Sequence, residues 1–172
     1  MSDRKVVINK KQIHEKVAAL AAQISADYSG KDLILTGVLN GAFIFLADLT
    51  RAITIPHQID FIRVASYGNS DSSSGTITLT KDIELDCKGK HVLLVEDIID
   101  TGATLDWLTN KFNDQDAASV RICALINKKE RRISEIPIDY IGFSLERGFL
   151  IGYGLDYAQQ HRHLPEIYTL QP

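Results

Sequence analysis

The sequence predicts an α/β protein with a central, mostly parallel sheet flanked by helices. Apolar runs of strand length alternate with stretches whose apolar residues recur at helical spacing, the order typical of parallel strands joined by helices. The run Val92–Val95 is short and apolar throughout, as expected for a strand buried on both faces of such a sheet. Polar and glycine residues follow several strands at their carboxyl ends, the edge where open α/β sheets bind ligands.

The first elements of the chain are a helix, a strand and a second helix. Residues 11–29 place apolar side chains on one helical face, and Gly30 stands where a helix is expected to end. An apolar strand is expected over 32–38, and the turn Leu39–Gly41 then leads into a second helix carrying several apolar residues. This turn is either a ligand loop or only a helix-capping turn, and on the residues alone both interpretations stand.

A long polar segment separates the next two expected strands. Residues 58–64 form a strand, residues 65–75 are small or polar apart from one aromatic, and residues 76–80 alternate strictly between threonine and apolar side chains. A polar loop of this length inside a compact domain usually has a function, often as a lid over an active site. The alternative is a flexible hairpin that has no function in binding or catalysis.

The most informative stretch is 91–105, where a strand, a loop and a helix start follow one another. Glu96 and Asp97 close the strand, and a tight turn from Asp100 to Thr104 enters the helix. Such a turn directs backbone N–H groups and two hydroxyls at one point, with the positive end of the helix dipole behind them, which favours a phosphate. The two carboxylates would repel that phosphate and must face ribose hydroxyls or Mg²⁺. The loop is therefore predicted to bind a ribose 5-phosphate.

Candidate functional residues also follow the later strands. A strand over 120–126 ends near Lys128, which would lie at the same sheet edge as Asp97, whereas residues 129–131 are expected to be solvated surface. After a further strand over 140–145 comes a segment rich in glycine and aromatic residues. Its Phe149 would either pack in the core or stack on a base. Asp156, between apolar neighbours, would be costly to bury without a partner such as a metal.

Composition places the chain among ordinary globular proteins and excludes several classes. The 172 residues fit a single domain, with 45% hydrophobic and 24% charged residues. A net charge of −3 and a pI near 5.9 give no electrostatic case for nucleic acid. Residues 1–5 lack the apolar core of a signal peptide, and nothing in the sequence spans a membrane. Cys87 and Cys123 form no disulfide framework or metal spacing, so we expect a cytoplasmic protein.

Two segments carry a resemblance to a known family. Val95–Thr104 resembles the phosphoribosyl-pyrophosphate signature of the type I phosphoribosyltransferases, and in detail that of the hypoxanthine (hypoxanthine-guanine) phosphoribosyltransferases of compact bacterial type. Phe149–Tyr157 resembles the purine-binding hood segment of the same family. Ser66 and Tyr67 match the pair found in the family's mobile lid. The resemblance extends in the same order over roughly residues 8–170.

The resemblance implies a fold, a reaction and partners. The fold would be one phosphoribosyltransferase domain over residues 1–172, with a core at about 8–145 and a small hood formed by about 146–172 together with the N-terminal residues. The reaction would be a step of purine salvage, in which the 5-phosphoribosyl group of phosphoribosyl pyrophosphate passes to hypoxanthine or guanine. The products would be IMP or GMP and pyrophosphate, the cofactor Mg²⁺, and the assembly a homodimer or homotetramer.

The family's roles can be carried over position by position. Asp100 would be the general base near N7 of the purine, and the turn that contains it would hold the 5-phosphate. The ribose-phosphate positions are Glu96, Asp97, Asp100, Thr101, Gly102, Ala103 and Thr104. The purine positions are Ile98, Lys128, Phe149, Leu150 and Asp156. The pyrophosphate positions are Leu39, Asn40, Gly41, Arg132 and Arg162. The metal positions are Asp156, Glu96 and Asp97.

Within those roles, Lys128 would donate to the 6-oxo group of the base, and the Leu39–Asn40 peptide is typically cis in the family. Two positions depart from the human-type pattern, because Asn40 and Ala103 stand where those enzymes carry lysine. Backbone N–H donors remain at both positions, so we expect altered affinity and not a different activity.

Two alternative functions fit the residues less well. A regulatory member of the same fold that binds RNA would need a basic face with interleaved aromatic residues, which the acidic balance disfavours. A nucleotide-binding domain of the dinucleotide or Walker kind would need a glycine motif that the sequence lacks.

Overall fold

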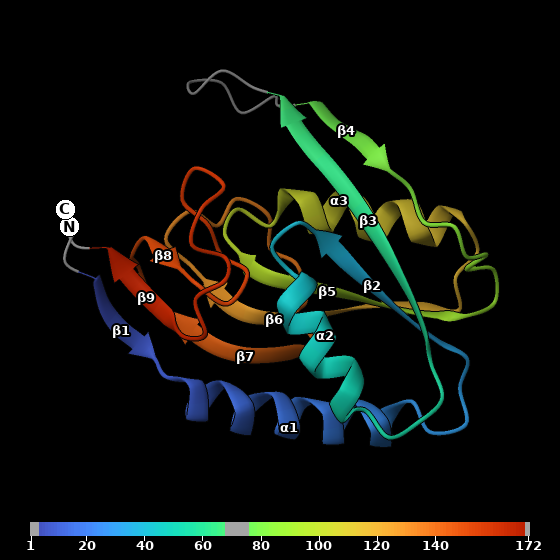
Figure 1. Cartoon of the computed structure of the whole chain (residues 1–172). Coiled ribbons are helices and arrows are strands. Elements are labelled where there is room, and N and C mark those ends of the chain that lie inside the picture. The colour runs from blue at the N-terminus through green and yellow to red at the C-terminus, as the bar shows by residue number, and fades with distance from the viewer. Residues whose placement is uncertain (1–3, 68–75, 171–172) are drawn as a thin grey trace.

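The computed structural model describes residues 4–67 and 76–170 of the chain, and Figure 1 shows its arrangement. In this part of the chain the main sheet has the strand order β4-β3-β2-β5-β6-β7, in which neighbours are parallel except β3 and β4. The strands are β2 (Leu33–Leu39), β3 (Gln58–Tyr67), β4 (Thr76–Lys81), β5 (His91–Ile99), β6 (Ser119–Lys128) and β7 (Tyr140–Leu145). The mostly parallel sheet expected from the sequence is confirmed.

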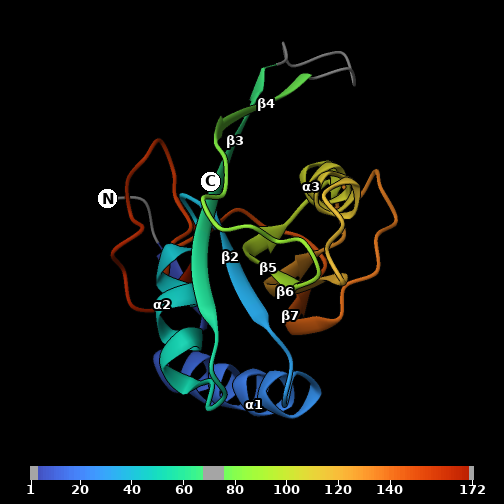
Figure 2. The ribbon, with the colours of Figure 1, turned by 90° about the vertical axis from the view of Figure 1, so that its right-hand side faces the viewer.

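Helices cover both faces of this sheet, as Figure 2 shows. The helices α1 (Lys10–Asp27) and α2 (Phe43–Ala52) lie on one face, and α3 (Ala103–Asp114) lies on the other. Helix α1 begins with a capping box, because the Asn9 side chain accepts from the N–H of Gln12 and the Gln12 side chain accepts from the N–H of Asn9, both at 2.9 Å. Within the described residues, no helix is long and apolar enough to span a membrane.

A second, smaller sheet joins the two ends of the chain. Its order is β1-β9-β8, all antiparallel, with β1 (Arg4–Ile8), β8 (Leu150–Ile151) and β9 (Ile167–Leu170). Figure 1 shows these strands beside one another at the same end of the molecule. This small sheet, Phe149 next to β8 and the loop between β8 and β9 are called the hood below.

Strand β5 supplies the centre of the core. Val92, Leu93, Leu94 and Val95 are fully buried, and alternate residues enter opposite clusters: Leu93 and Val95 pack on the side of α1 and α2, and Val92 and Leu94 on the side of α3. Burying each such side chain contributes roughly 1.5–3 kcal/mol. The expected two-sided burial of this strand is therefore confirmed, and it fixes the polar end of β5 at the sheet edge.

Strands β5 and β3 extend further than the polar residues at their carboxyl ends suggested. Strand β5 continues through Glu96 and Asp97 to Ile99, because β6 offers backbone partners as far as the pairing of Ile99 with Asn127. Strand β3 continues to Tyr67 because β4 pairs with it. Hydrogen bonding between neighbouring strands thus overrides local polarity. The central part of the expected lid, residues 68–75, lies outside the described residues.

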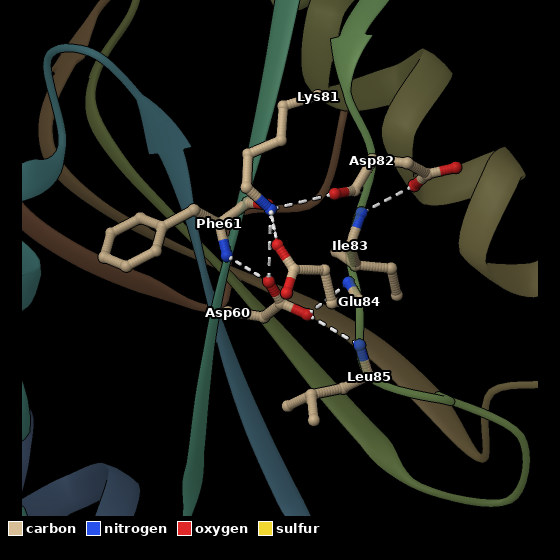
Figure 3. Close-up of polar contacts among 7 residues, drawn as sticks. All are labelled: Asp60, Phe61, Lys81, Asp82, Ile83, Glu84 and Leu85. Carbon is tan, nitrogen blue, oxygen red and sulfur yellow. Dashed lines mark hydrogen bonds and ion pairs between the residues drawn. The ribbon is translucent and has the colours of Figure 1, made fainter.

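A buried carboxylate fixes the base of the β3–β4 hairpin, as shown in Figure 3. The Asp60 side chain accepts hydrogen bonds from the N–H groups of Phe61 (2.7 Å), Glu84 (2.7 Å) and Leu85 (2.8 Å). The Nζ of Lys81 lies 3.6 Å from an Asp60 oxygen. These contacts hold the connection that follows β4 against β3, from which the hairpin projects (Figure 2).

Candidate active site

The turn between β5 and α3 forms a small cavity. Gly102 precedes the first residue of α3 and has a φ of +84°, which glycine adopts without the strain of a side chain. The first N–H groups of a helix have no intrahelical acceptor and can bind a ligand, although that of Ala103 donates here to Thr101 Oγ1 at 3.3 Å. The cavity has a volume of about 140 Å³ and is lined by Glu96, Ile98, Ile99, Asp100, Thr101, Gly102, Thr104 and Leu105. Its position and lining suit an anion at the N-terminus of α3.

Two carboxylates stand beside this cavity at the end of β5. Asp97 is buried and Glu96 half-buried, and the N–H of Asp97 donates to Glu96 Oε1 at 3.2 Å. Burial raises the pKa of Glu96 well above its usual value, and the adjacent Asp97 raises it further. Burial also raises the pKa of Asp97, although hydrogen bonds, chiefly that with the Glu96 side chain, and the charge of Arg162 oppose the shift. The pair therefore favours partners that donate hydrogen bonds or carry positive charge.

The turn after β2 packs directly on this acid pair. A Cβ on Gly41 would lie 2.0 Å from Asp97 Oδ2, and a Cβ on Gly154 of the hood would lie 2.0 Å from the carbonyl oxygen of Gly41. The peptide bond between Leu39 and Asn40 is cis, as in the resembled family. The loop Leu39–Gly41 thus lies between the end of β5 and the hood, and its role as a ligand loop stays a prediction.

The ends of β5 and β6 bring a lysine and an aspartate together. The Nζ of Lys128 lies 3.6 Å from Asp100 Oδ1, which is buried and accepts no hydrogen bond within the described residues. Arg132 joins the two strand ends, because its guanidinium donates to the carbonyl oxygens of Asp100 and Lys128, both at 3.2 Å, and to Asn127 Oδ1 at 2.5 Å. The expected pyrophosphate contact of Arg132 stays a prediction, and the contacts seen here are with the protein itself.

The hood contributes an exposed aromatic ring and an ion pair. Phe149 is 50% exposed, and its ring meets the edge of Tyr157 at a centroid distance of 5.3 Å. The carboxylate of Asp156 forms an ion pair with Arg162 Nη2 at 2.8 Å and accepts a hydrogen bond from the N–H of Gln159 at 2.8 Å. Asp156 therefore has partners for its charge, and Phe149 is half-exposed although it contacts Tyr157.

The carboxylates of the site are candidate ligands for a metal ion. Within residues 4–67 and 76–170, no three His, Cys, Asp or Glu side chains converge closely enough to hold a metal by themselves. Mg²⁺ usually keeps several waters and is bound by one or two carboxylates together with substrate phosphates. The pair of half-buried Glu96 and buried Asp97 beside the anion cavity is a donor set of that kind. The residues present therefore fit a Mg²⁺ ion that arrives with a phosphorylated substrate.

The structure brings most of the expected residues to one edge of the main sheet, and it adds others that the sequence did not indicate. Asn127 is buried and orients Arg132, and Gly154 allows the hood to approach Gly41. The place of Asn127 beside Lys128 at a strand end was the available signal, whereas nothing local marked Gly154. Ser66 and Tyr67 end β3, but their side chains lie outside the described part of the structure, so the lid role stays a prediction.

Comparison with known proteins agrees with this geometry. Residues 8–158 match the model of the phosphoribosyl transferase domain. The hypoxanthine phosphoribosyltransferase of Haemophilus influenzae is 43% identical over 165 residues, which cover 94% of this chain and 92% of that protein. The hypoxanthine-guanine phosphoribosyltransferase of Streptococcus pneumoniae is 44% identical over 168 residues, which cover 98% and 93%.

Solved structures give the same result for the fold. A crystal structure of a Staphylococcus aureus hypoxanthine phosphoribosyltransferase superposes with a TM-score of 0.94 at 36% identity, covering 98% of this chain and 91% of that one. A hypoxanthine-guanine phosphoribosyltransferase from Bacillus anthracis has a TM-score of 0.94 at 39% identity, covering 99% and 100%. The chain belongs to the phosphoribosyltransferase family and, within it, to the hypoxanthine phosphoribosyltransferases.

Proposed function

We propose that the chain transfers the 5-phosphoribosyl group of phosphoribosyl pyrophosphate to hypoxanthine or guanine, giving IMP or GMP and pyrophosphate. Its place is in purine salvage. The observation that carries the proposal is the pairing of Lys128 Nζ with Asp100 Oδ1 at 3.6 Å, with Asp100 also lining the anion cavity at α3. A donor for the base and an acceptor for its proton thus adjoin the place where a ribose 5-phosphate would be held.

The reaction forms a bond between C1 of the ribose and a purine nitrogen, and it breaks the bond between C1 and pyrophosphate. Asp100 is suited to accept the proton that the purine loses, because its Oδ1 has no hydrogen-bond donor within the described residues. The N–H groups at the start of α3 would hold the 5-phosphate and keep C1 in place. Glu96 and Asp97 would accept hydrogen bonds from the ribose hydroxyls.

Lys128 would select the base. An ammonium group only donates hydrogen bonds, so it accepts a 6-oxo purine and would face another donor in the 6-amino group of adenine. A buried donor left without an acceptor costs on the order of 1–3 kcal/mol. Phe149 would stack on the purine ring, Ile98 would contact it, and the backbone of Leu150 would meet its edge. Hypoxanthine and guanine are therefore favoured.

The leaving pyrophosphate would lie between the Leu39–Gly41 loop and Arg162 of the hood. We propose Mg²⁺ as the cofactor, held by Glu96 and Asp97 or by Asp156 together with the substrate phosphates. When bound, Mg²⁺ would neutralise charge that develops on the departing pyrophosphate. Arg162 would supply positive charge from the protein at the same place. Because Arg162 also pairs with Asp156, its orientation is already set by the hood.

The assembly and location expected from the sequence remain proposals. A homodimer or homotetramer suits small enzymes of this kind. A cytoplasmic location and a single domain with a core and a hood are also kept as predictions.

The test is pyrophosphate release from phosphoribosyl pyrophosphate with Mg²⁺, with hypoxanthine, guanine, xanthine, adenine and uracil added one at a time. Release with hypoxanthine and guanine but not with adenine or uracil is the expected result. The assay with xanthine measures a base for which the residues of the site predict neither use nor exclusion. Release with none of the bases, from a protein that still binds a purine nucleotide, would overturn the enzyme assignment and favour a regulatory nucleotide-binding role.

A further inference from the structure

A hydrogen bond links the hood to helix α2. The hydroxyl of Tyr153 donates to Asp48 Oδ2 at 2.5 Å, although the two residues are far apart in the sequence. The Tyr153 side chain is 5% exposed, whereas Asp48 stands at the surface of α2 and also pairs with Arg51. Figures 1 and 2 both show the loop between β8 and β9 beside α2.

On the hood side, Tyr153 belongs to the segment that carries the purine and pyrophosphate residues. Its N–H donates to the carbonyl oxygen of Leu164 at 2.8 Å, and the next N–H, of Gly154, donates to the carbonyl oxygen of Arg162 at 3.0 Å. The Arg162 guanidinium returns a hydrogen bond to the carbonyl oxygen of Gly154 at 2.7 Å. Tyr153 also has a φ of +50°, a conformation uncommon for a residue with a side chain. Tyr153 is therefore joined to Arg162 through the backbone of its neighbour Gly154.

On the other side, α2 carries the loop proposed to bind pyrophosphate. The helix begins at Phe43, two residues after Gly41, and the N–H of Phe43 donates to the carbonyl oxygen of Asn40 at 3.4 Å. Asp48 lies in the middle of this ten-residue helix. A group that fixes Asp48 thus fixes the direction from which the Leu39–Gly41 loop enters the site.

Packing at this junction is incomplete, which increases the importance of the bond. A cavity of about 510 Å³ lies between α1, α2 and the hood, and its lining includes Asp48, Tyr153 and Leu164. Side chains next to a cavity have fewer neighbours to hold them in place. The orientation of the hood at this point therefore depends more on the hydrogen bond than it would in a close-packed interface.

We propose that Tyr153 is a positioning residue that, through its hydrogen bond to Asp48, aligns the purine-binding hood with the pyrophosphate loop. The inference rests on the proposed function, because it concerns the alignment of the two substrates of that reaction. Each substrate would still bind to its own half of the site without the bond. What would be lost is the alignment of the purine nitrogen with C1 of the ribose, and small displacements of reacting groups cost rate steeply.

The experiment compares Tyr153→Phe with wild type in single-turnover formation of IMP, with enzyme in excess over phosphoribosyl pyrophosphate and with saturating hypoxanthine. We expect the rate to fall by about 10- to 100-fold, while the dissociation constants of phosphoribosyl pyrophosphate and IMP change by less than about threefold. Asp48→Ala should match Tyr153→Phe. Asp48→Asn should retain most of the rate, because an amide oxygen still accepts from the tyrosine hydroxyl. The double variant Tyr153→Phe with Asp48→Ala should be no slower than either single variant.

A matched control is available within the hood. The hydroxyl of Tyr168 donates to Glu166 Oε2 at 2.9 Å, a tyrosine–carboxylate bond of the same kind that does not reach α2. Tyr168→Phe should leave the single-turnover rate unchanged. The inference is overturned if Tyr153→Phe is as fast as wild type, or if Asp48→Asn is as slow as Asp48→Ala. A wild-type protein that forms no IMP overturns the proposed function, and the inference with it.

Discussion

The Nζ of Lys128 lies 3.6 Å from Oδ1 of Asp100, although Lys128 ends β6 and Asp100 directly follows β5. The parallel pairing of β5 with β6 places them together, because it continues to the end of both strands and matches Ile99 with Asn127. Arg132 then fixes their separation through hydrogen bonds to both main chains. In the free protein Lys128 and Asp100 thus pair with each other. When a purine binds between them, Lys128 would instead contact its 6-oxo group, and Asp100 would contact its N7.

The first prediction concerns Asp100 as general base. Replacement of Asp100 by alanine should lower turnover by roughly 10²–10⁴-fold, the range associated with general acid–base catalysis. Binding of phosphoribosyl pyrophosphate should be largely kept, because the N–H groups at α3 remain. Steady-state turnover and calorimetric binding would be measured together, with the exposed Asp114 of α3 changed to alanine as control. Unchanged turnover in Asp100→Ala would remove this carboxylate from the chemistry.

The second prediction concerns base selection. Lys128→Ala should weaken the binding of hypoxanthine and guanine, and it should narrow their advantage over adenine by about 10-fold or more, since one desolvated donor contributes about 1–3 kcal/mol. The measurement is kcat/KM for each base. Lys129→Ala is the matched control, because Lys129 is exposed one residue further along. If adenine stays excluded as strongly as before, another group selects the base.

The third prediction concerns Gly41. An alanine Cβ at this position would lie 2.0 Å from Asp97 Oδ2, so either the loop or the carboxylate must move. Gly41 does not have a positive φ, and the substitution therefore tests this contact and not backbone strain. We expect Gly41→Ala to lose most of its affinity for phosphoribosyl pyrophosphate while purine nucleotide without pyrophosphate still binds. An equal loss of affinity for phosphoribosyl pyrophosphate and for the purine nucleotide would point to a general disruption of the site.

The fourth prediction concerns the stability of the β3–β4 hairpin. Burial opposes ionisation of Asp60, but hydrogen bonds from Leu85, Phe61 and Glu84 and the charge of Lys81 hold its pKa below the usual value. A carboxyl whose pKa is lower in the folded state stabilises the fold above the unfolded-state pKa of about 4, and this contribution is lost as the pH falls through the folded-state pKa. Asp60→Asn should therefore lower the free energy of unfolding by about 1–3 kcal/mol at neutral pH.

Below a pH of about 4 the difference in the free energy of unfolding between Asp60→Asn and wild type should narrow, because the wild-type carboxyl then becomes protonated and loses its charge. Urea denaturation at neutral pH and at a series of acidic values measures this gap. Asp114→Asn, at an exposed position, should show no comparable pH dependence. A gap that stays constant with pH would show that packing around Asp60, and not its charge, carries the stabilisation.

Much of this architecture could be predicted from the sequence because its signals are local. The apolar run Val92–Val95 specifies a strand buried on both faces, and the glycine of Asp100–Thr104 specifies the turn into a helix. Strand β7 was expected over 140–145 and lies at Tyr140–Leu145. The strand-end residues Asp97 and Lys128 were correctly placed at one sheet edge, since parallel strands present their carboxyl ends together.

The sequence by itself determined the helices and the strands of the main sheet, their order and the chemistry available at the strand ends, because hydrophobic periodicity and turn residues act over a few neighbouring positions. It did not predict the short strands β1, β8 and β9 of the hood. Only the tertiary structure decided which distant groups meet. The contacts of Tyr153 with Asp48, Gly154 with Gly41, and Arg132 with the ends of β5 and β6 join segments that no periodicity relates. Such contacts depend on how the hood and the loops settle on the sheet, and that is fixed by packing and hydrogen bonding summed over the whole chain.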